Sequence, residues 1–228
     1  MAARSSQSGA EALPAPAGGP FRAFTYRDFA LFWGGSILSI SSFFMLFFVR
    51  GQLMLNLTGS PFMVSAISAA PGLPMFFLGL LGGALADRVN RKAILIGAEA
   101  VNVVVLLTLA ALVLTEQVQV WQIFLLSVLN GTTFALALPA RAALVPNLLR
   151  PEDMANGVAL GTTVFSGAQF VGPALVGYVM PSFGIGIAFL VAALLPLPTL
   201  LLFSLMHPRQ EGMGATSQGS MLRSILDG

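Results

Sequence analysis

The chain has 228 residues, of which 56% are hydrophobic and only 9% are charged, and its formal net charge is +2. An average soluble domain carries about 25% charged residues, so this composition cannot cover a water-facing surface and predicts an all-α membrane protein. The chain has no cysteine and a single histidine, His207, so we expect no enzyme, no metal site and no cofactor. Its scattered basic residues, without aromatic residues between them, argue against a nucleic-acid partner.

The amino-terminal segment, residues 1–20, is rich in small residues and proline. It cannot bury enough apolar area to offset the entropy of ordering, so we predict a disordered cytoplasmic tail. The first long apolar stretch begins near Phe29, which is too late and too long for a cleaved signal peptide.

Six segments downstream are apolar over the roughly 20 residues that a helix needs to cross the hydrocarbon core of a membrane. We place them at residues 29–56, 62–86, 93–115, 119–140, 155–180 and 184–206. Residues 21–206 are therefore predicted to form a six-transmembrane-helix bundle, in which short turns make neighbouring helices antiparallel.

The basic residues outside the apolar segments all fall on one side of these six helices, whereas the opposite turns hold only Glu116. The positive-inside rule then places both termini in the cytoplasm. The ten basic residues on this side are Arg4, Arg22, Arg27, Arg88, Arg91, Lys92, Arg141, Arg150, Arg209 and Arg223.

The segment between the second and third apolar stretches reads GALADRVNRK. This order of glycine, leucine, aspartate and basic residues resembles the signature loop of the major facilitator superfamily. The resemblance implies a conformational latch, in which Asp87 binds the start of a helix from a second half of the transporter. A loop that only sets topology through its positive charge is the alternative. The signature positions are Gly83, Leu85, Asp87, Arg88, Asn90, Arg91 and Lys92.

Asn90 stands where the family has its second glycine. Asparagine tolerates a left-handed backbone better than most residues, so we expect a tight turn to survive there.

A second stretch, residues 135–160, joins the fourth and fifth apolar segments and contains PAR, LVP and EDMAN. With the first helix, which begins FRAFTYRDFALFWGGSILS, it resembles the branch of the superfamily that holds enterobactin exporters and macrolide-efflux proteins. The resemblance implies the amino-terminal half of a transporter, built as a 3+3 inverted repeat in a bacterial inner (plasma) membrane. It also implies export of a small molecule, coupled to protons.

The fifth apolar segment contains GAQFVGPALVG, which resembles the antiporter motif of drug exporters but lacks one of its paired glycines. Small residues here predict a closely packed helix face, and ordinary helix packing is the alternative to a moving contact. The motif residues are Gly167, Gly172, Pro173 and Gly177.

Ionisable residues inside a membrane cost several kcal/mol unless they are paired or hydrated, so each one is a candidate functional residue. Arg50 is a candidate for the substrate path, with an arginine that extends to the headgroups as the alternative. Glu99 is expected to pair with Arg141, as a structural tether or as a proton carrier. Uncharged candidates for lining a cavity are Gln52, Asn102, Asn130 and Gln169.

Residues 207–228 have the composition of the start of a cytoplasmic linker. We expect this linker to be truncated. The predicted function is efflux by alternating access, with the lipid bilayer, a small-molecule substrate and protons as partners. A second six-helix half, or self-association, would complete the transporter. The alternative is a degenerate half-transporter that acts as a membrane scaffold without transport.

Overall fold

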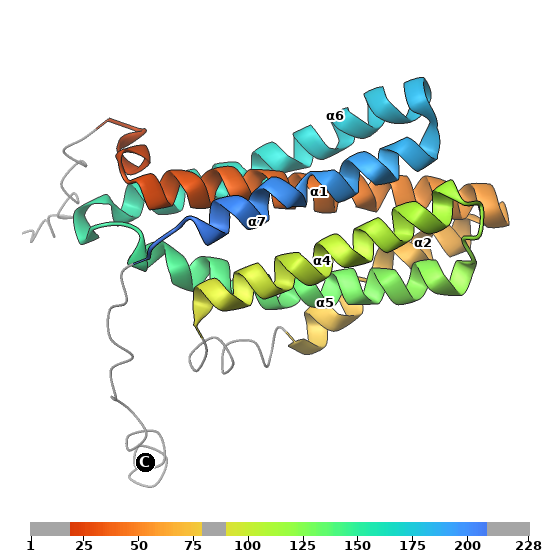
Figure 1. The fold of residues 1–228 in the computed structure, drawn as a ribbon, viewed down its shortest axis with the longest axis horizontal. Coiled ribbons are helices and arrows are strands. Elements are labelled where there is room, and N and C mark those ends of the chain that lie inside the picture. The colour runs from red at the N-terminus through yellow and green to blue at the C-terminus, as the bar shows by residue number, and fades with distance from the viewer. Residues whose placement is uncertain (1–18, 79–89, 209–228) are drawn as a thin grey trace, which may run out of the picture.

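The computed structural model describes residues 19–78 and 90–208, and throughout these ranges the regular structure is helical, without strands. The long helices lie side by side in one elongated bundle (Figure 1). The all-α fold class expected from composition is confirmed. The elements are η1 Arg22–Thr25, α1 Arg27–Thr58, α2 Pro61–Ala69, α4 Arg91–Leu114, α5 Val120–Leu144, η2 Val145–Asn147, η3 Pro151–Asp153, α6 Met154–Leu194 and α7 Pro196–Ser204.

Five helical stretches of the described chain are long and apolar enough to cross a membrane. Four contain between 18 and 32 residues, whereas the fifth contains 54 and would be about 80 Å long if it were straight. The stretches are Arg27–Thr58, Pro61–Leu78, Arg91–Leu114, Val120–Asn147 and Pro151–Ser204.

The fifth stretch reverses direction at Gly184, within α6. The φ of 84° and ψ of 169° at Gly184 are not helical, and glycine adopts this backbone without a Cβ penalty. The chain then returns through α7, which packs against α1 and α4 (Figure 1). The sequence predicts a short turn at residues 181–184, which includes the residue of this reversal.

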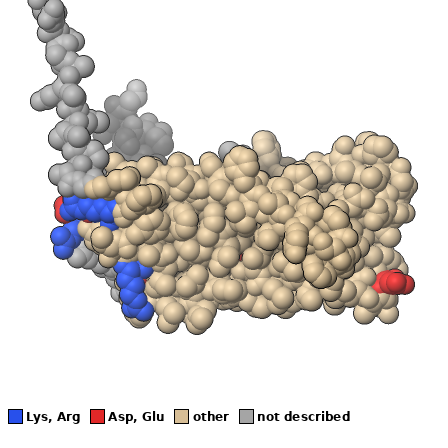
Figure 2. All heavy atoms as spheres, turned by 90° about the horizontal axis from the view of Figure 1, so that it is seen from above, with Lys and Arg blue, Asp and Glu red and all other residues tan. Residues whose placement is uncertain are grey.

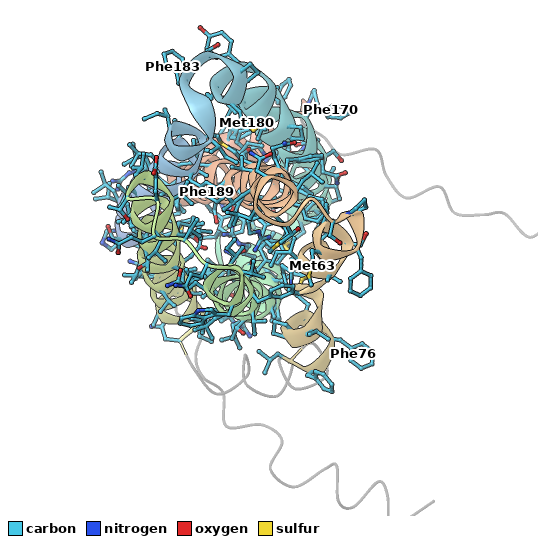
Figure 3. All side chains as sticks on the ribbon, turned by 90° about the vertical axis from the view of Figure 1, so that its right-hand side faces the viewer. Met63, Phe76, Phe170, Met180, Phe183 and Phe189 are labelled. Carbon is cyan, nitrogen blue, oxygen red and sulfur yellow. The ribbon has the colours of Figure 1, made fainter. Side chains whose placement is uncertain are left out.

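Large apolar side chains cover the outside of the bundle. Phe76, Phe170 and Phe183 are 70%, 78% and 60% exposed. They point away from the helices in Figure 3, whereas Phe189 lies inside and is buried. Such a surface needs an apolar solvent, so it agrees with a multi-pass protein in lipid.

Charged side chains gather at the ends of the bundle. Figure 2 shows the Lys and Arg residues of one face at a single end, and an acidic residue at the other. We call the first end the basic end, and it holds Arg22, Arg27, Arg91, Lys92 and Arg150.

The interior contains two large apolar clusters that follow one another along its length, and a small third cluster of Ile40, Val164 and Ala168. One cluster, near the basic end, includes Phe29, Leu95 and Phe203. The other, farther along the bundle, includes Leu46, Leu106 and Phe189. Buried polar side chains of α1, α4 and α5 come between them in sequence.

Candidate functional site

The buried polar residues between the two apolar clusters form what we call the polar layer. Each member is less than 9% exposed, although all of them lie in helices long enough to span a membrane. Buried polar groups at such depth are costly unless they bind one another, so their contacts indicate what the layer can do. The members are Ser36 and Ser39 of α1, Glu99 and Asn102 of α4, and Asn130, Thr133 and Arg141 of α5.

Arg141 is the centre of the charged part of this layer. Its Nη1 donates to Ser36 Oγ at 2.7 Å, and its Nη2 donates to Ser39 Oγ at 2.9 Å. The Ser39 hydroxyl in turn donates to Glu99 Oε2 at 2.9 Å. Arg141 Nη2 lies 3.6 Å from the same carboxylate oxygen, and the guanidinium stands 5.4 Å from the ring centre of Phe203. The structure therefore brings Glu99 and Arg141 together across α4 and α5, with α1 completing the contact.

The uncharged part of the layer lies next to Glu99. Asn130 Nδ2 donates to Asn102 Oδ1 at 2.7 Å and so joins α5 to α4. Glu99 Oε1 and Asn130 Oδ1 are both buried and have no hydrogen-bond partner in the described chain. A cavity of about 10 Å³ opens among these residues, close to the volume that one water needs. The layer thus contains two free acceptors and a place for a small polar species.

Arg50 is buried deeper in the bundle, among apolar residues. It is 1% exposed, and none of its three guanidinium nitrogens has a hydrogen-bond partner in the described chain. It does not extend to the surface, so the alternative of a snorkelling arginine does not describe this conformation. Arg50 follows Ser39 by 11 residues, which at about 100° per residue places both within about 20° on one face of α1.

The other cavity candidates are not gathered around Arg50. Gln52 is half-buried and donates to Asn56 Oδ1 of its own helix at 2.9 Å. Gln169 is exposed on α6. Of the uncharged cavity residues expected from sequence, Asn102 and Asn130 lie in the polar layer, whereas Gln52 and Gln169 do not.

The signature loop is described only in its last part, since Gly83, Leu85, Asp87 and Arg88 lie outside the described residues. Arg91 Nη1 donates to the carbonyl of Ala143 at 2.8 Å. Lys92 Nζ donates to the carbonyls of Ser204 and Met206 at 2.8 and 2.6 Å. These cations therefore stabilise the carboxyl-terminal ends of α5 and α7, where the helix dipole favours positive charge.

The left-handed turn expected at Asn90 is wrong. Its φ is −57° and its ψ is 111°, and its Oδ1 accepts hydrogen bonds from the N–H groups of Lys92 and Ala93 at 3.0 and 3.3 Å. Asn90 is thus the N-cap of α4, a role for which asparagine is among the preferred residues.

The glycines of the α6 motif differ in how closely they pack against α1. At Gly172, a Cβ would lie 2.8 Å from the Met45 nitrogen, the Phe44 Cβ and the Ser41 oxygen, so α6 meets the backbone of α1 there. A Cβ at Gly167 would lie 3.4 Å from Ile37, whereas Gly177 has nothing within 4 Å. Pro173 follows the point of closest approach. The motif therefore supports packing at Gly172 and leaves Gly177 open.

Sequence reasoning missed the buried serines of α1, of which Ser36 and Ser39 belong to the polar layer. Ser36, Ser39 and Ser42 recur at intervals of three, and this spacing places them on neighbouring positions of one helix face. Ser42 Oγ donates to the carbonyl of Ala192 at 2.6 Å, which ties α1 to α6. A search for polar residues at helical spacing in the first apolar segment would have found them.

A polar clamp at the basic end was also missed. The Tyr26 hydroxyl donates to Asp153 Oδ2 at 2.6 Å, and Arg22 Nε lies 3.1 Å from Asp153 Oδ1. The Ala23 N–H donates to Asn156 Oδ1 at 3.0 Å. The hydrogen bond to Asp153 raises the pKa of the Tyr26 hydroxyl. The clamp ties η1 and the start of α1 to the start of α6.

These sites contain no constellation typical of catalysis. Within residues 19–78 and 90–208, no group of three or more His, Cys, Asp or Glu residues could hold a metal ion. What the polar layer can do is hold a buried charge and accept further hydrogen bonds.

Comparison with known proteins gives a family for this arrangement. Residues 18–226 match a family of major facilitator proteins described as transmembrane secretion effectors. A homologue of the multi-drug resistance efflux pump PmrA from Lactococcus lactis is 31% identical over 85% of this chain and 45% of its own. Macrolide efflux protein A from Streptococcus pyogenes is 24% identical over 87% of this chain and 53% of its own.

A third relative, the uncharacterized MFS-type transporter YfiS from Bacillus subtilis, is 28% identical over 60% of this chain and 32% of its own. The chain therefore spans between about a third and about half of the length of these relatives.

Proposed function

Because this chain belongs to the transmembrane secretion effector family of major facilitator transporters, we propose that it forms one six-helix half of a transporter. The transporter exports a small molecule by alternating access, in which two halves open in turn to each side of the membrane. The six spans follow if the stretch Pro151–Ser204 crosses twice, with its reversal at Gly184. The bundle then consists of two three-helix units of opposite orientation.

The observation that carries the proposal is the face of α1 that holds both Ser39 and Arg50. Among the described residues Arg50 is a cation without a partner inside an apolar cluster, which is costly for a protein that only has to fold. Such residues in membrane proteins mark the paths of substrates and ions. A substrate that reaches this face would supply the missing partner.

The polar layer supports coupling to protons. A carboxyl group that is held by Ser39 and Arg141 on one oxygen and is free on the other can bind a proton without losing its existing contacts. In this proposal Glu99 and Arg141 form both a tether and the proton-carrying group. The signature loop and the motif around Gly172 are assigned to the contacts that change during opening.

Orientation follows from the basic end, which we place in the cytoplasm together with both termini. The membrane is then the bacterial inner membrane. The substrate class is that of the similar efflux proteins, namely macrolides and other multi-drug resistance substrates.

The second candidate function is a half-transporter that acts as a scaffold and transports nothing. Half of a rocking transporter cannot alternate access on its own, so this second function applies if no second half joins the six helices. The two functions differ in whether cells that produce the protein export a substrate.

Accumulation of radiolabelled erythromycin tests the proposal. In cells without their own macrolide pumps, we expect lower accumulation when the protein is produced with a second six-helix half, and unchanged accumulation when residues 1–228 are produced alone. Asp87→Asn and Arg91→Ala should each abolish export at normal membrane levels. Unchanged accumulation under every condition would favour the scaffold, and full export by both variants would reduce the loop to a topology signal.

A further inference from the structure

A hollow of about 560 Å³ at the basic end shares only Tyr26 with the polar clamp and no residue with the polar layer. It lies where the start of α1, the connection between η2 and η3 and the segment that follows α7 meet. Its volume is within the range of small-ligand sites. The hollow is lined by Tyr26, Arg27, Asp28, Asn147, Leu148, Leu149, Arg150 and His207.

The charges of this hollow fit a singly charged anion. Its two arginines and one aspartate leave an excess of one positive charge when His207 is neutral. Arg27 has no hydrogen bond or ion pair to any described residue. Arg150 lies 3.9 Å from Glu152, but both side chains are more than half exposed, so this pair contributes little. Both guanidinium groups are therefore available to a ligand, and guanidinium groups bind phosphate with paired hydrogen bonds.

The depth of the hollow corresponds to the headgroups of a lipid leaflet. Arg27 is the first residue of one candidate membrane span, and Arg150 directly precedes another. Leu148 and Leu149 form a buried apolar floor. Leu201 of α7 and Leu205, which caps this helix, are exposed four residues apart, and Leu205 lies two residues before His207. A ligand with a phosphate and apolar chains can contact both the two arginines and these exposed leucines. A soluble anion can contact only the arginines.

We propose that this hollow binds the headgroup phosphodiester of an anionic phospholipid, with Arg27 and Arg150 on the phosphate and the acyl chains along Leu201 and Leu205. In the proposed orientation the lipid belongs to the cytoplasmic leaflet. It would hold together the start of α1, the connection between α5 and α6 and the end of α7. The site does not depend on transport, since its geometry uses none of the residues of the polar layer.

Native mass spectrometry of the whole chain, released from a neutral detergent, tests this site. Phosphatidylglycerol and phosphatidylcholine are added at equal concentration, and retained lipid is counted as the collision energy rises. The wild type should retain phosphatidylglycerol preferentially. Arg27→Gln with Arg150→Gln should lower that retention by about fivefold for each arginine, the scale expected for a basic residue beside anionic lipid.

Arg91→Gln is the matched control, because it removes one positive charge from the basic end outside the hollow, and it should retain the lipid like the wild type. Arg27 and Arg150 are both exposed, so replacing either one alone should not disturb folding. If the double variant does not fold, lipid retention is measured on the two single variants instead. Equal retention by wild type and double variant would overturn the site. Displacement of the lipid by an equal concentration of inorganic phosphate would assign the hollow to a free phosphate and overturn the lipid.

Discussion

Glu99 and Arg141 place opposite charges 3.6 Å apart inside the bundle, yet in the described chain only one of the two carboxylate oxygens has a partner. The pair is shielded from solvent on both sides, since the two side chains are 4% and 9% exposed. Removing one partner of such a buried pair strongly destabilises a protein, because the other charge stays buried without a counter-charge. Replacing both partners together changes the stability little.

The first prediction concerns this pair. Arg141→Met leaves the Glu99 carboxylate without a counter-charge, so we expect a loss of about 3–5 kcal/mol in the free energy of unfolding. The double variant Arg141→Met with Glu99→Gln should recover most of that loss. Denaturant unfolding in a mild detergent, followed by tryptophan fluorescence, measures both values. Additive losses in the double variant would mean that the two residues do not interact.

Arg50 gives a prediction of the opposite sign. Arg50→Met removes a buried cation that has no described partner, so the unfolding free energy should stay the same or rise by about 1 kcal/mol. Erythromycin export should be lost, because the substrate path loses its charge. Arg50→Lys keeps the charge and serves as the control. If Arg50→Met is destabilised by several kcal/mol, the arginine is a structural residue.

The glycines of α6 provide a matched pair for packing. Gly172→Ala forces a methyl group to within 2.8 Å of the α1 backbone, so we expect a loss of about 1–3 kcal/mol. Gly177→Ala meets open space in the middle of a helix and should be neutral or stabilising by about 0.5–1 kcal/mol. Thermal unfolding of the two variants side by side measures the difference. Equal stability would show that α1 and α6 do not approach closely at Gly172.

The cap of α4 gives a fourth prediction. Asn90→Ala removes the oxygen that accepts from Lys92 and Ala93, and should cost about 1 kcal/mol of unfolding free energy. Asn90→Gly introduces the glycine that the family signature has at this position, and should lower the unfolding free energy by only a few tenths of a kcal/mol. Chemical denaturation of both variants compares them. A larger loss for glycine than for alanine would mean that the cap is not what Asn90 contributes.

The sequence predicted helices rather than strands, because a helix satisfies all the backbone hydrogen bonds of a long apolar segment in a membrane. The third apolar segment was placed at 93–115, and α4 runs over Arg91–Leu114. The break between α6 and α7 was not anticipated, because it depends on Pro196 and on the packing that follows Gly184.

The site was harder to predict, because hydropathy gives the depth of a residue and not the direction in which it points. Glu99 and Arg141 were paired from depth and sign of charge. Arg50 and Gln169 are both polar residues in apolar helices, yet one is buried and the other faces outward. These helices are apolar on every side, so no polar face indicates which side meets the neighbouring helix.

The central claim is that the face of α1 between Ser39 and Arg50 lines a path that opens to each side of the membrane in turn. The chain has no cysteine, so a single Leu46→Cys on this face can be labelled with an impermeant maleimide in right-side-out and everted vesicles. Phe48→Cys, on the exposed side of α1, is the lipid-facing control, and Glu116→Cys in the turn after α4 is the accessible one. The account predicts that erythromycin changes the labelling rate of Leu46→Cys in opposite directions from the two sides, while Phe48→Cys stays unreactive. Leu46→Cys that remains unlabelled from both sides, with and without erythromycin, would contradict it.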